Sequence, residues 1–295
     1  MNSKNGFQLL DPLVLAKLAK IILRARFVVD GLMTGMHKSP DKGRSVEFSQ
    51  HRGYSFGDEI KSIDWRVFAR SDKYYVKEYE AETNLKGYLV LDTSASMAYH
   101  SDGISKLDYG KQLAASLAYL MFKQRDAFGL VTFAETIRSN HPPRSTQVHL
   151  QEVLNELENI QPKGETSLGE ILFNLAKNLK RRHLVILISD LLDDPKDVLD
   201  GLKHFRFKKH EVVVFHLLDR DELTFPFKNL TRFEGMEDLL KITVDPQAIR
   251  KEYLNEVESF VKTYKQGCRQ EQIDYFLIDT ATPLEKAITG FVSNR

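Results

Sequence analysis

One carboxylate and two hydroxyls follow each other at alternate positions where an apolar run ends. Residues 88–91 are apolar, and Asp92, Ser94 and Ser96 come directly after them. Such a run is typical of a strand buried on both faces of a sheet. Carboxylate and hydroxyl oxygens are hard ligands, and a mostly uncharged set of them suits Mg²⁺ or Mn²⁺ rather than zinc or copper. Because α/β folds place their sites at the carboxyl ends of strands, the motif marks a candidate cation site.

Two later segments supply more oxygen ligands. Thr166 stands in a break between two amphipathic helical stretches, and Asp190 ends a second buried-strand pattern at residues 183–189. Each candidate also has an ordinary alternative, because Asp, Ser and Thr are favoured as helix N-caps. Asp190, for example, shortly precedes a helix that opens at Pro195. The joint occurrence of all the candidates, in this order and on these elements, favours a metal site over a series of separate caps.

The complete set resembles the metal-ion-dependent adhesion site of von Willebrand factor type A domains; it consists of Asp92, Ser94, Ser96, Thr166 and Asp190. The resemblance implies that the hydroxyls bind the cation directly and that the aspartates mostly hold its water ligands. It also implies that a carboxylate from a partner protein fills one open position. Neutral inner ligands leave the cation electrophilic enough to attract an outside anion, whereas a cage of carboxylates would quench it.

A second signature precedes the first strand. Its segments are Glu47-Phe48, Arg52-Gly53-Tyr54, Gly57-Asp58, Ile63-Asp64-Trp65 and Ala69-Arg70. It resembles the signature of the family catalogued as "domain of unknown function 58", which precedes a von Willebrand factor A-like domain. The resemblance covers the chain from about residue 43 to its end. It implies an accessory factor of a MoxR-type AAA+ ATPase in bacteria, acting in the assembly or maturation of other proteins. One departure is Glu165, where the family has glycine; it either points to solvent or alters access to the cation.

Strand and helix patterns alternate from residue 86 onward, which predicts a doubly wound α/β domain with a mostly parallel sheet. We place this von Willebrand factor A-like domain at residues 85–295 and a small N-terminal α+β module at residues 1–84. Strands are expected at residues 86–92, 127–133, 183–189, 211–218 and 273–279, with a strand or hairpin arm at 73–82. Helices are expected at residues 106–123, 147–160, 168–180, 195–205, 246–266 and 283–292, with an extended insertion at 233–244.

Composition limits the classes of partner. The 42 Lys and Arg residues balance the 41 Asp and Glu residues, so the charge of +1 gives no case for nucleic acid or acidic membrane. The single cysteine, Cys268, excludes an internal disulfide and fits a reducing compartment. We find neither a secretory signal nor an apolar run of the roughly 20 residues that a membrane span needs. An amphipathic helix is expected within residues 9–36. The sequence therefore predicts a cytoplasmic protein without a transmembrane segment.

Two functions remain after these exclusions. The first is a non-enzymatic, divalent-cation-dependent interaction protein whose partner is a MoxR-type ATPase or its client. The second is a metal-dependent hydrolase that uses the Asp92 site. A phosphoaspartyl phosphatase would need an acid where Ser94 stands, and no Walker loop, nucleophile elbow or dinucleotide fingerprint occurs. The acidic segment 219–222 follows a strand at the same predicted edge, where it would shape a partner surface. The interaction function is favoured.

Overall fold

A computed structural model describes residues 46–54, 64–71, 73–81, 86–101, 103–180, 182–236 and 241–293 of the 295-residue chain. These residues fall into two compact units, 46–81 and 86–293. The amphipathic helix expected within residues 9–36 and the signature residues 55–63 lie outside the described residues.

The smaller unit is an antiparallel hairpin with one short helix. Its elements are β1 (Val46–Gly53), α2 (Trp65–Ser71) and β2 (Tyr75–Ala81). Asp64 begins α2, since its carboxylate accepts the Val67 amide at 3.4 Å. The Phe68 and Tyr74 rings stack with centroids 4.5 Å apart. The strand expected within residues 73–82 is confirmed by β2.

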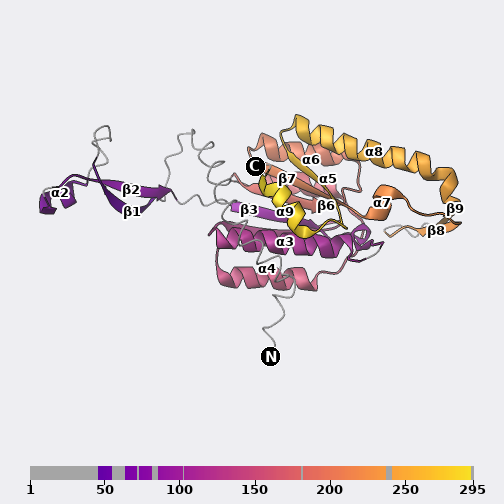
Figure 1. The fold of residues 1–295 in the computed structure, drawn as a ribbon, viewed down its shortest axis with the longest axis horizontal. Coiled ribbons are helices and arrows are strands. Elements are labelled where there is room, and N and C mark those ends of the chain that lie inside the picture. Colours follow the sequence, from indigo (N-terminus) through magenta and orange to yellow (C-terminus); the bar gives the residue numbers. More distant parts are fainter. Residues whose placement is uncertain are drawn as a thin grey trace, which may run out of the picture. The chain divides into compact units, whose positions relative to one another are not determined.

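The larger unit, shown in Figure 1, is built on a six-stranded sheet. The order of its strands is β10-β7-β6-β3-β4-β5. The strands are β3 (Lys86–Asp92), β4 (Ala127–Phe133), β5 (Ile137–Arg144), β6 (Leu184–Ser189), β7 (Glu211–Leu218) and β10 (Asp274–Asp279). All pairs are parallel except β4 with β5. The chain order reverses between β3 and β6, which makes the sheet doubly wound and places its topological switch point there. The predicted fold class is confirmed.

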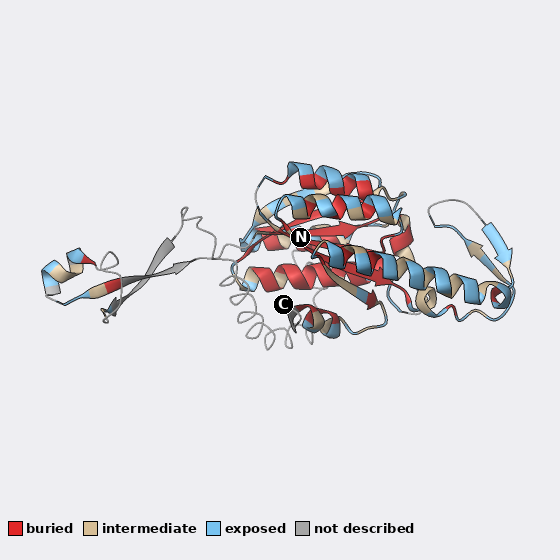
Figure 2. Cartoon of the chain, turned by 90° about the horizontal axis from the view of Figure 1, so that it is seen from above, coloured by how far each residue is buried: buried red, intermediate tan, exposed pale blue. Residues whose placement is uncertain are grey.

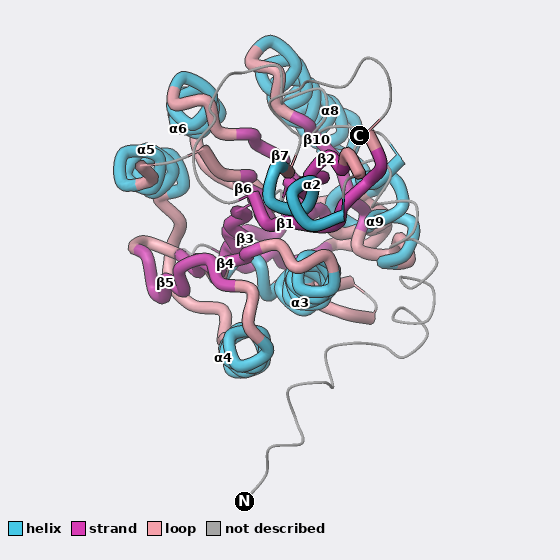
Figure 3. Tube along the Cα trace, turned by 90° about the vertical axis from the view of Figure 1, so that its left-hand side faces the viewer, coloured by secondary structure: helices cyan, strands magenta, loops and turns pink. Residues whose placement is uncertain are grey.

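Helices cover both faces of this sheet. They are α3 (Lys106–Lys123), α4 (Gln147–Asn159), α5 (Leu168–Asn178), α6 (Pro195–Phe207), α7 (Arg220–Thr224), α8 (Pro246–Gln270) and α9 (Leu284–Ser293), with a 3₁₀ turn, η3 (Ala95–Ala98). Helices α3, α4 and α9 lie on one face, and α5, α6 and α8 lie on the other (Figure 3).

The core has one layer on each side of the sheet. Leu89 and Leu91 of β3 pack in the cluster that contains α3, α4 and α9, whereas Tyr88 and Val90 pack in the cluster of α5, α6 and α8. The central strands are therefore buried on both sides, as the colouring of Figure 2 shows. This double burial explains why their sequences are continuous apolar runs rather than alternating patterns.

Two features of the larger unit were not expected from the sequence. The first is the edge strand β5, whose side chains are mostly exposed and which contains Pro142 and Pro143. Proline is confined to sheet edges because it cannot donate to the ladder. The second is α7, directly after β7. The insertion expected at residues 233–244 corresponds to a hairpin of β8 (Thr231–Glu234) and β9 (Lys241–Val244). Within the described part of the chain, no helix combines the length and the apolar character that a membrane span requires.

Candidate metal centre

The motif after β3 folds into a compact turn that gathers its oxygen atoms. The Ser94 amide donates a hydrogen bond to Asp92 Oδ1 at 2.9 Å. The 3₁₀ turn η3 then brings Ser96 back toward Ser94, so that the two hydroxyl oxygens lie 3.0 Å apart. All three side chains are buried. The alternate spacing in the sequence therefore places one carboxylate and two hydroxyls together at the end of the strand.

The neighbouring strand β6 contributes the second carboxylate. The Ser189 hydroxyl donates to Asp92 Oδ2 at 2.6 Å, which ties the ends of β3 and β6 together. Asp190 follows and is fully buried. Burial, and then the negative charge of Asp190, raise the pKa of Asp92 to about 7, against the hydrogen bonds from Ser189 and Ser94. A bound cation would relieve the repulsion between these two carboxylates.

Thr166 comes from a loop that is held against the turn after β3. The Ala95 amide donates to the Gly164 carbonyl at 2.9 Å, and the Lys163 amide donates to the Thr93 carbonyl at 3.0 Å. The Thr166 hydroxyl oxygen is buried and has no hydrogen-bond partner among the residues that the structure describes. Buried hydroxyls are normally satisfied, but Ser116 Oγ on α3 shares this state, so the lack of a partner alone does not mark a ligand position. What makes Thr166 a candidate ligand is its place on the loop that is tied to the Ser94–Ser96 turn.

The helix-cap alternative is wrong for Thr166 and Asp190. The N-cap of α5 is Ser167, and the N-cap of α6 is Asp194, whose carboxylate accepts the Lys196 amide at 2.8 Å. Ser94 occupies the N-cap position of η3, but its side chain makes no capping hydrogen bond there. Helix capping therefore does not account for the side-chain oxygens of Ser94, Thr166 and Asp190.

A buried ammonium, which the sequence analysis missed, lies beside Asp190. Lys106 Nζ donates to Asp190 Oδ2 at 2.8 Å and to Glu222 Oε1 at 2.7 Å, and its side chain is fully buried. Burial acts to lower the pKa of Lys106, but the two carboxylates outweigh it and raise that pKa. The residue follows the Ser105 N-cap of α3, where the helix dipole disfavours positive charge. The only sign of this buried lysine in the sequence is its position in the first turn of a predicted helix, where a positive charge is unfavourable.

The short helix α7 holds Glu222 in place. Asp219 Oδ1 accepts the Asp221 amide at 2.9 Å, and Glu222 Oε2 accepts the Asp219 amide at 2.7 Å, which is a capping box. Burial acts to raise the pKa of Asp219, but hydrogen bonds from Ser101, Asp221 and Thr280 outweigh it and lower that pKa. Segment 219–222 thus lies at the edge where the sequence analysis placed it, since β7 is parallel to β6.

The chain matches the family described as "Protein of unknown function DUF58" over residues 50–261. It belongs to this family. The resemblance to this family is thereby confirmed. Two similar relatives are uncharacterized proteins, Rv1480 of Mycobacterium tuberculosis and Mb1516 of Mycobacterium bovis. Each is 26% identical over 219 residues, which cover 73% of this chain and 68% of the relative.

Similar solved structures include the conserved hypothetical protein BatB of Bacteroides thetaiotaomicron, with a TM-score of 0.49 and 20% identity over 71% of this chain and 98% of BatB. An aerotolerance-related membrane protein of Bacteroides fragilis has a TM-score of 0.49 and 19% identity over 72% of this chain and 100% of its own. The SpRpn10 VWA domain has a TM-score of 0.38 and 10% identity over 70% of this chain and 94% of its own. The fold of this DUF58 protein is assigned from its strand order and pairing.

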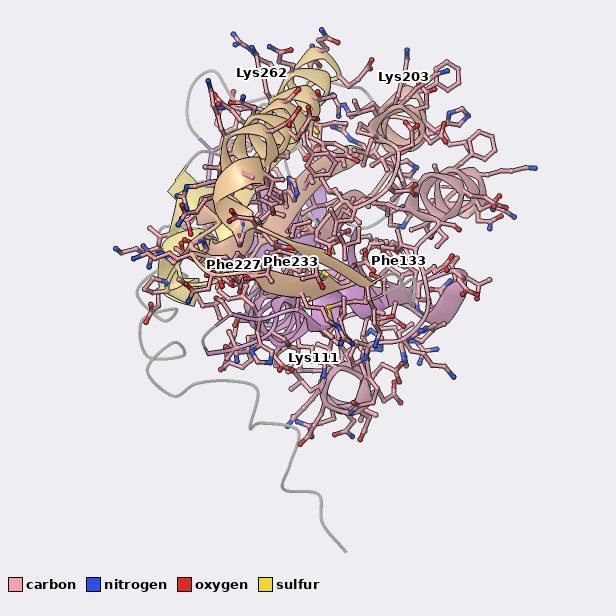
Figure 4. The ribbon with its side chains drawn as sticks, turned by 90° about the vertical axis from the view of Figure 1, so that its right-hand side faces the viewer. Lys111, Phe133, Lys203, Phe227, Phe233 and Lys262 are labelled. Atoms are coloured by element: carbon pink, nitrogen blue, oxygen red, sulfur yellow. The ribbon has the colours of Figure 1, made fainter. Side chains whose placement is uncertain are left out.

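A pocket of about 500 Å³ opens beside the oxygen cluster of this DUF58 protein. Its lining residues are Ser96, Tyr99, Lys106, Glu165, Leu192, Glu222 and Met236. Glu165 is exposed and forms part of this lining, so it stands at the entrance to the site. The β8–β9 hairpin that leads to Met236 is anchored by packed rings, including Phe227 and Phe233 with centroids 5.2 Å apart (Figure 4). Access to the cluster is therefore shaped by both acidic and apolar side chains.

The donor set fits a hard divalent cation. Among the described residues, no group of three or more His, Cys, Asp or Glu side chains is arranged to hold a metal ion. A cation at this edge would therefore depend on the hydroxyls of Ser94, Ser96 and Thr166 together with Asp92, Asp190 and water. Such an all-oxygen set suits Mg²⁺ or Mn²⁺, whereas structural zinc sites use histidine and cysteine.

Proposed function

We propose that this DUF58 protein is a non-enzymatic, divalent-cation-dependent protein-interaction factor. Its cation site consists of Asp92, Ser94, Ser96, Thr166 and Asp190 at the switch point. The observation that carries the proposal is the buried Thr166 hydroxyl without a hydrogen-bond partner among the described residues, on a loop tied to the Ser94–Ser96 turn. Mg²⁺ or Mn²⁺, when bound, supplies a positive centre for a carboxylate of the partner.

The lining of the pocket supports the proposal of a particular kind of partner. Leu192 and Met236 line it and remain 44% and 45% exposed, so apolar surface borders the polar cluster. A partner segment with an Asp or Glu next to an apolar side chain fits this combination. In line with the family resemblance, the proposed partner is a MoxR-type AAA+ ATPase, or the client that such an ATPase remodels during assembly or maturation.

The hydrolase alternative is less well supported. A pKa of about 7 would suit Asp92 as a general base. Its two oxygens, however, already accept hydrogen bonds from the Ser94 amide and the Ser189 hydroxyl, and its side chain is fully buried. A nucleophile or base must contact the reacting atom directly, and an Asp92 whose oxygens are both engaged suits that role less well than it suits holding a cation through water.

A pull-down with a purified MoxR-type ATPase from the same genome tests the proposal. Wild-type protein and the Ser94→Ala/Ser96→Ala variant are compared in Mg²⁺ and in EDTA. Ser116→Ala is the matched control, because Ser116 is a buried serine on α3 outside the site. We expect recovery by wild type and Ser116→Ala in Mg²⁺, and loss of recovery in EDTA or with the double variant. Recovery that ignores both the chelator and the double substitution would contradict a cation-dependent interface.

A further inference from the structure

A permanent positive charge lies inside the oxygen cluster. The Lys106 ammonium donates hydrogen bonds to Oδ2 of Asp190 and to Oε1 of Glu222. It also lies 5.9 Å from the centroid of the Tyr99 ring. Its side chain has no exposed surface. The proposed cation site therefore contains a cation of its own, held by α3 and directed at one of the proposed ligands.

The charges of this cluster can be counted. Asp92, Asp190 and Glu222 carry three negative charges when ionised, and Lys106 carries one positive charge, so two negative charges remain. One divalent cation neutralises that remainder. Without Lys106 the same cluster would hold three negative charges and would attract a divalent cation more strongly, because the Coulomb energy grows with the charge product at short range and low dielectric.

We propose that Lys106 is a built-in counter-cation that sets the affinity of the metal site. Lys106 is a positioning residue: it engages one oxygen of Asp190 and repels a divalent ion nearby. The site is thereby kept weak, and an incoming carboxylate strengthens it by adding a negative charge and an oxygen ligand to the bound cation. This inference rests on the proposed function, and it names the regulation of that same site.

Lys111 provides the matched comparison on the same helix. It is also buried, but its Nζ donates to the Ile160 carbonyl at 2.7 Å, and its ion-pair partner Asp108 lies 3.6 Å away and is half-exposed. None of these groups belongs to the proposed cation site. Lys111, labelled in Figure 4, thus shares the helix, the residue type and the burial of Lys106 without its carboxylate partners at the switch point.

The test is the dissociation constant for Mn²⁺, measured by titration calorimetry and by electron paramagnetic resonance. The variants are Lys106→Met, Glu222→Gln, the double variant Lys106→Met/Glu222→Gln, and Lys111→Met. We expect Lys106→Met to tighten Mn²⁺ binding at least about tenfold, because it removes a positive charge close to the cation. We expect Glu222→Gln to weaken Mn²⁺ binding at least about tenfold, because it removes a negative charge from the cluster. Lys111→Met should leave the constant unchanged.

The double variant keeps the test decisive if Lys106→Met does not fold. It removes one charge of each sign, so the cluster keeps two negative charges and Asp190 is released. It should bind Mn²⁺ at least about tenfold more tightly than Glu222→Gln alone. If the wild type binds Mn²⁺ but the double variant and Glu222→Gln bind it with equal affinity, the inference about Lys106 is overturned and the proposed function is not. Failure of the wild type and every variant to bind Mn²⁺ would overturn the proposed function and this inference with it.

Discussion

The two ends of the parallel sheet differ in the groups that surround their buried ionisable side chains. At the amino ends of β6 and β7, His210 is buried and accepts the His183 amide on Nδ1 at 3.1 Å. Burial lowers the pKa of His210 to about 4, so the ring is neutral at physiological pH. At the carboxyl ends of β3 and β6, burial and the negative charge of Asp190 likewise favour the neutral form of Asp92 and raise its pKa to about 7. The difference is the buried ion pair between Lys106 and Asp190, which lies at this end of the sheet.

The difference indicates that the buried groups at the amino end serve stability and that those at the carboxyl end serve binding. A buried ionisable group usually reaches its lowest cost by becoming neutral, as His210 does. The carboxyl end instead retains two aspartates, a lysine and a glutamate, which costs desolvation free energy that apolar side chains would avoid. A charged cluster of this kind is expected where the charges serve binding, and the unpartnered hydroxyl of Thr166 lies on a loop tied to the same end.

The largest effect should come from breaking the ion pair at the carboxyl end. Lys106→Met leaves the buried Asp190 and the partly buried Glu222 without their counter-ion and should lower the free energy of unfolding by about 3–5 kcal/mol. Lys111→Met removes one hydrogen bond to a carbonyl and should cost only about 1 kcal/mol. Chemical denaturation in EDTA measures both values. If both substitutions lowered the free energy of unfolding equally, Lys106 would contribute no more to stability than a buried lysine outside the switch point.

The second-largest effect should be a gain in stability when Asp92 is replaced by the neutral side chain of asparagine. Its pKa in the folded state lies above its unfolded value, so folding favours the protonated form and stability without metal falls as pH rises from about 4 to about 7. Asp92→Asn should therefore be more stable than wild type by on the order of 4 kcal/mol above pH 7 in EDTA, and about equally stable near pH 4. Added Mg²⁺ should stabilise only the wild type. A variant that is less stable than wild type at pH 8 in EDTA would contradict this account.

The amino end should respond to pH with the opposite sign. The pKa of His210 is lower in the folded state than in the unfolded chain, so its contribution is complete above about pH 6.5 and is lost as pH falls toward 4. His210→Asn keeps an acceptor for the His183 amide and removes the titration. Relative to this variant, wild type should lose on the order of 2 kcal/mol between pH 6.5 and 4. Parallel unfolding curves for the two proteins across this range would refute the neutral assignment of His210.

The smallest effect on stability should come from Thr166→Val. Replacing a buried hydroxyl without a hydrogen-bond partner by a methyl group of similar size should change the free energy of unfolding by less than about 0.5 kcal/mol. The same substitution should weaken Mg²⁺ binding, because it removes one proposed ligand. A clear loss of stability would mean that the hydroxyl is satisfied in the metal-free protein. Denaturation and calorimetry on one preparation supply both numbers.

The sequence predicted the central elements because their burial leaves a strong pattern. The bounds of β3, β4, β7 and α3 agree with the predicted ranges, since continuous apolar runs and a capped amphipathic helix are hard to misplace. The positions of the candidate ligands at strand ends follow from the same pattern. The metal site itself, its cation and its partner remain predictions.

The elements that were missed lack such patterns. Strand β5 is mostly exposed and contains prolines, so its residues resemble a loop. The partnership of Lys106 with Glu222 joins residues 116 positions apart, and only the folded sheet edge brings them together. A lysine in a first helical turn signalled an unusual environment, but the identity of its partner required the structure.

The central claim is tested most directly by locating the ion itself. Crystals of the wild-type protein grown with Mn²⁺ are measured at a wavelength where manganese scatters anomalously. The account predicts one strong anomalous peak at the switch point, within metal–oxygen bonding distance, about 2.1–2.3 Å, of the Ser94, Ser96 and Thr166 hydroxyls. Asp92 and Asp190 should be reached from this peak mainly through water. A peak confined to surface carboxylates, or no peak at saturating Mn²⁺, would contradict the account.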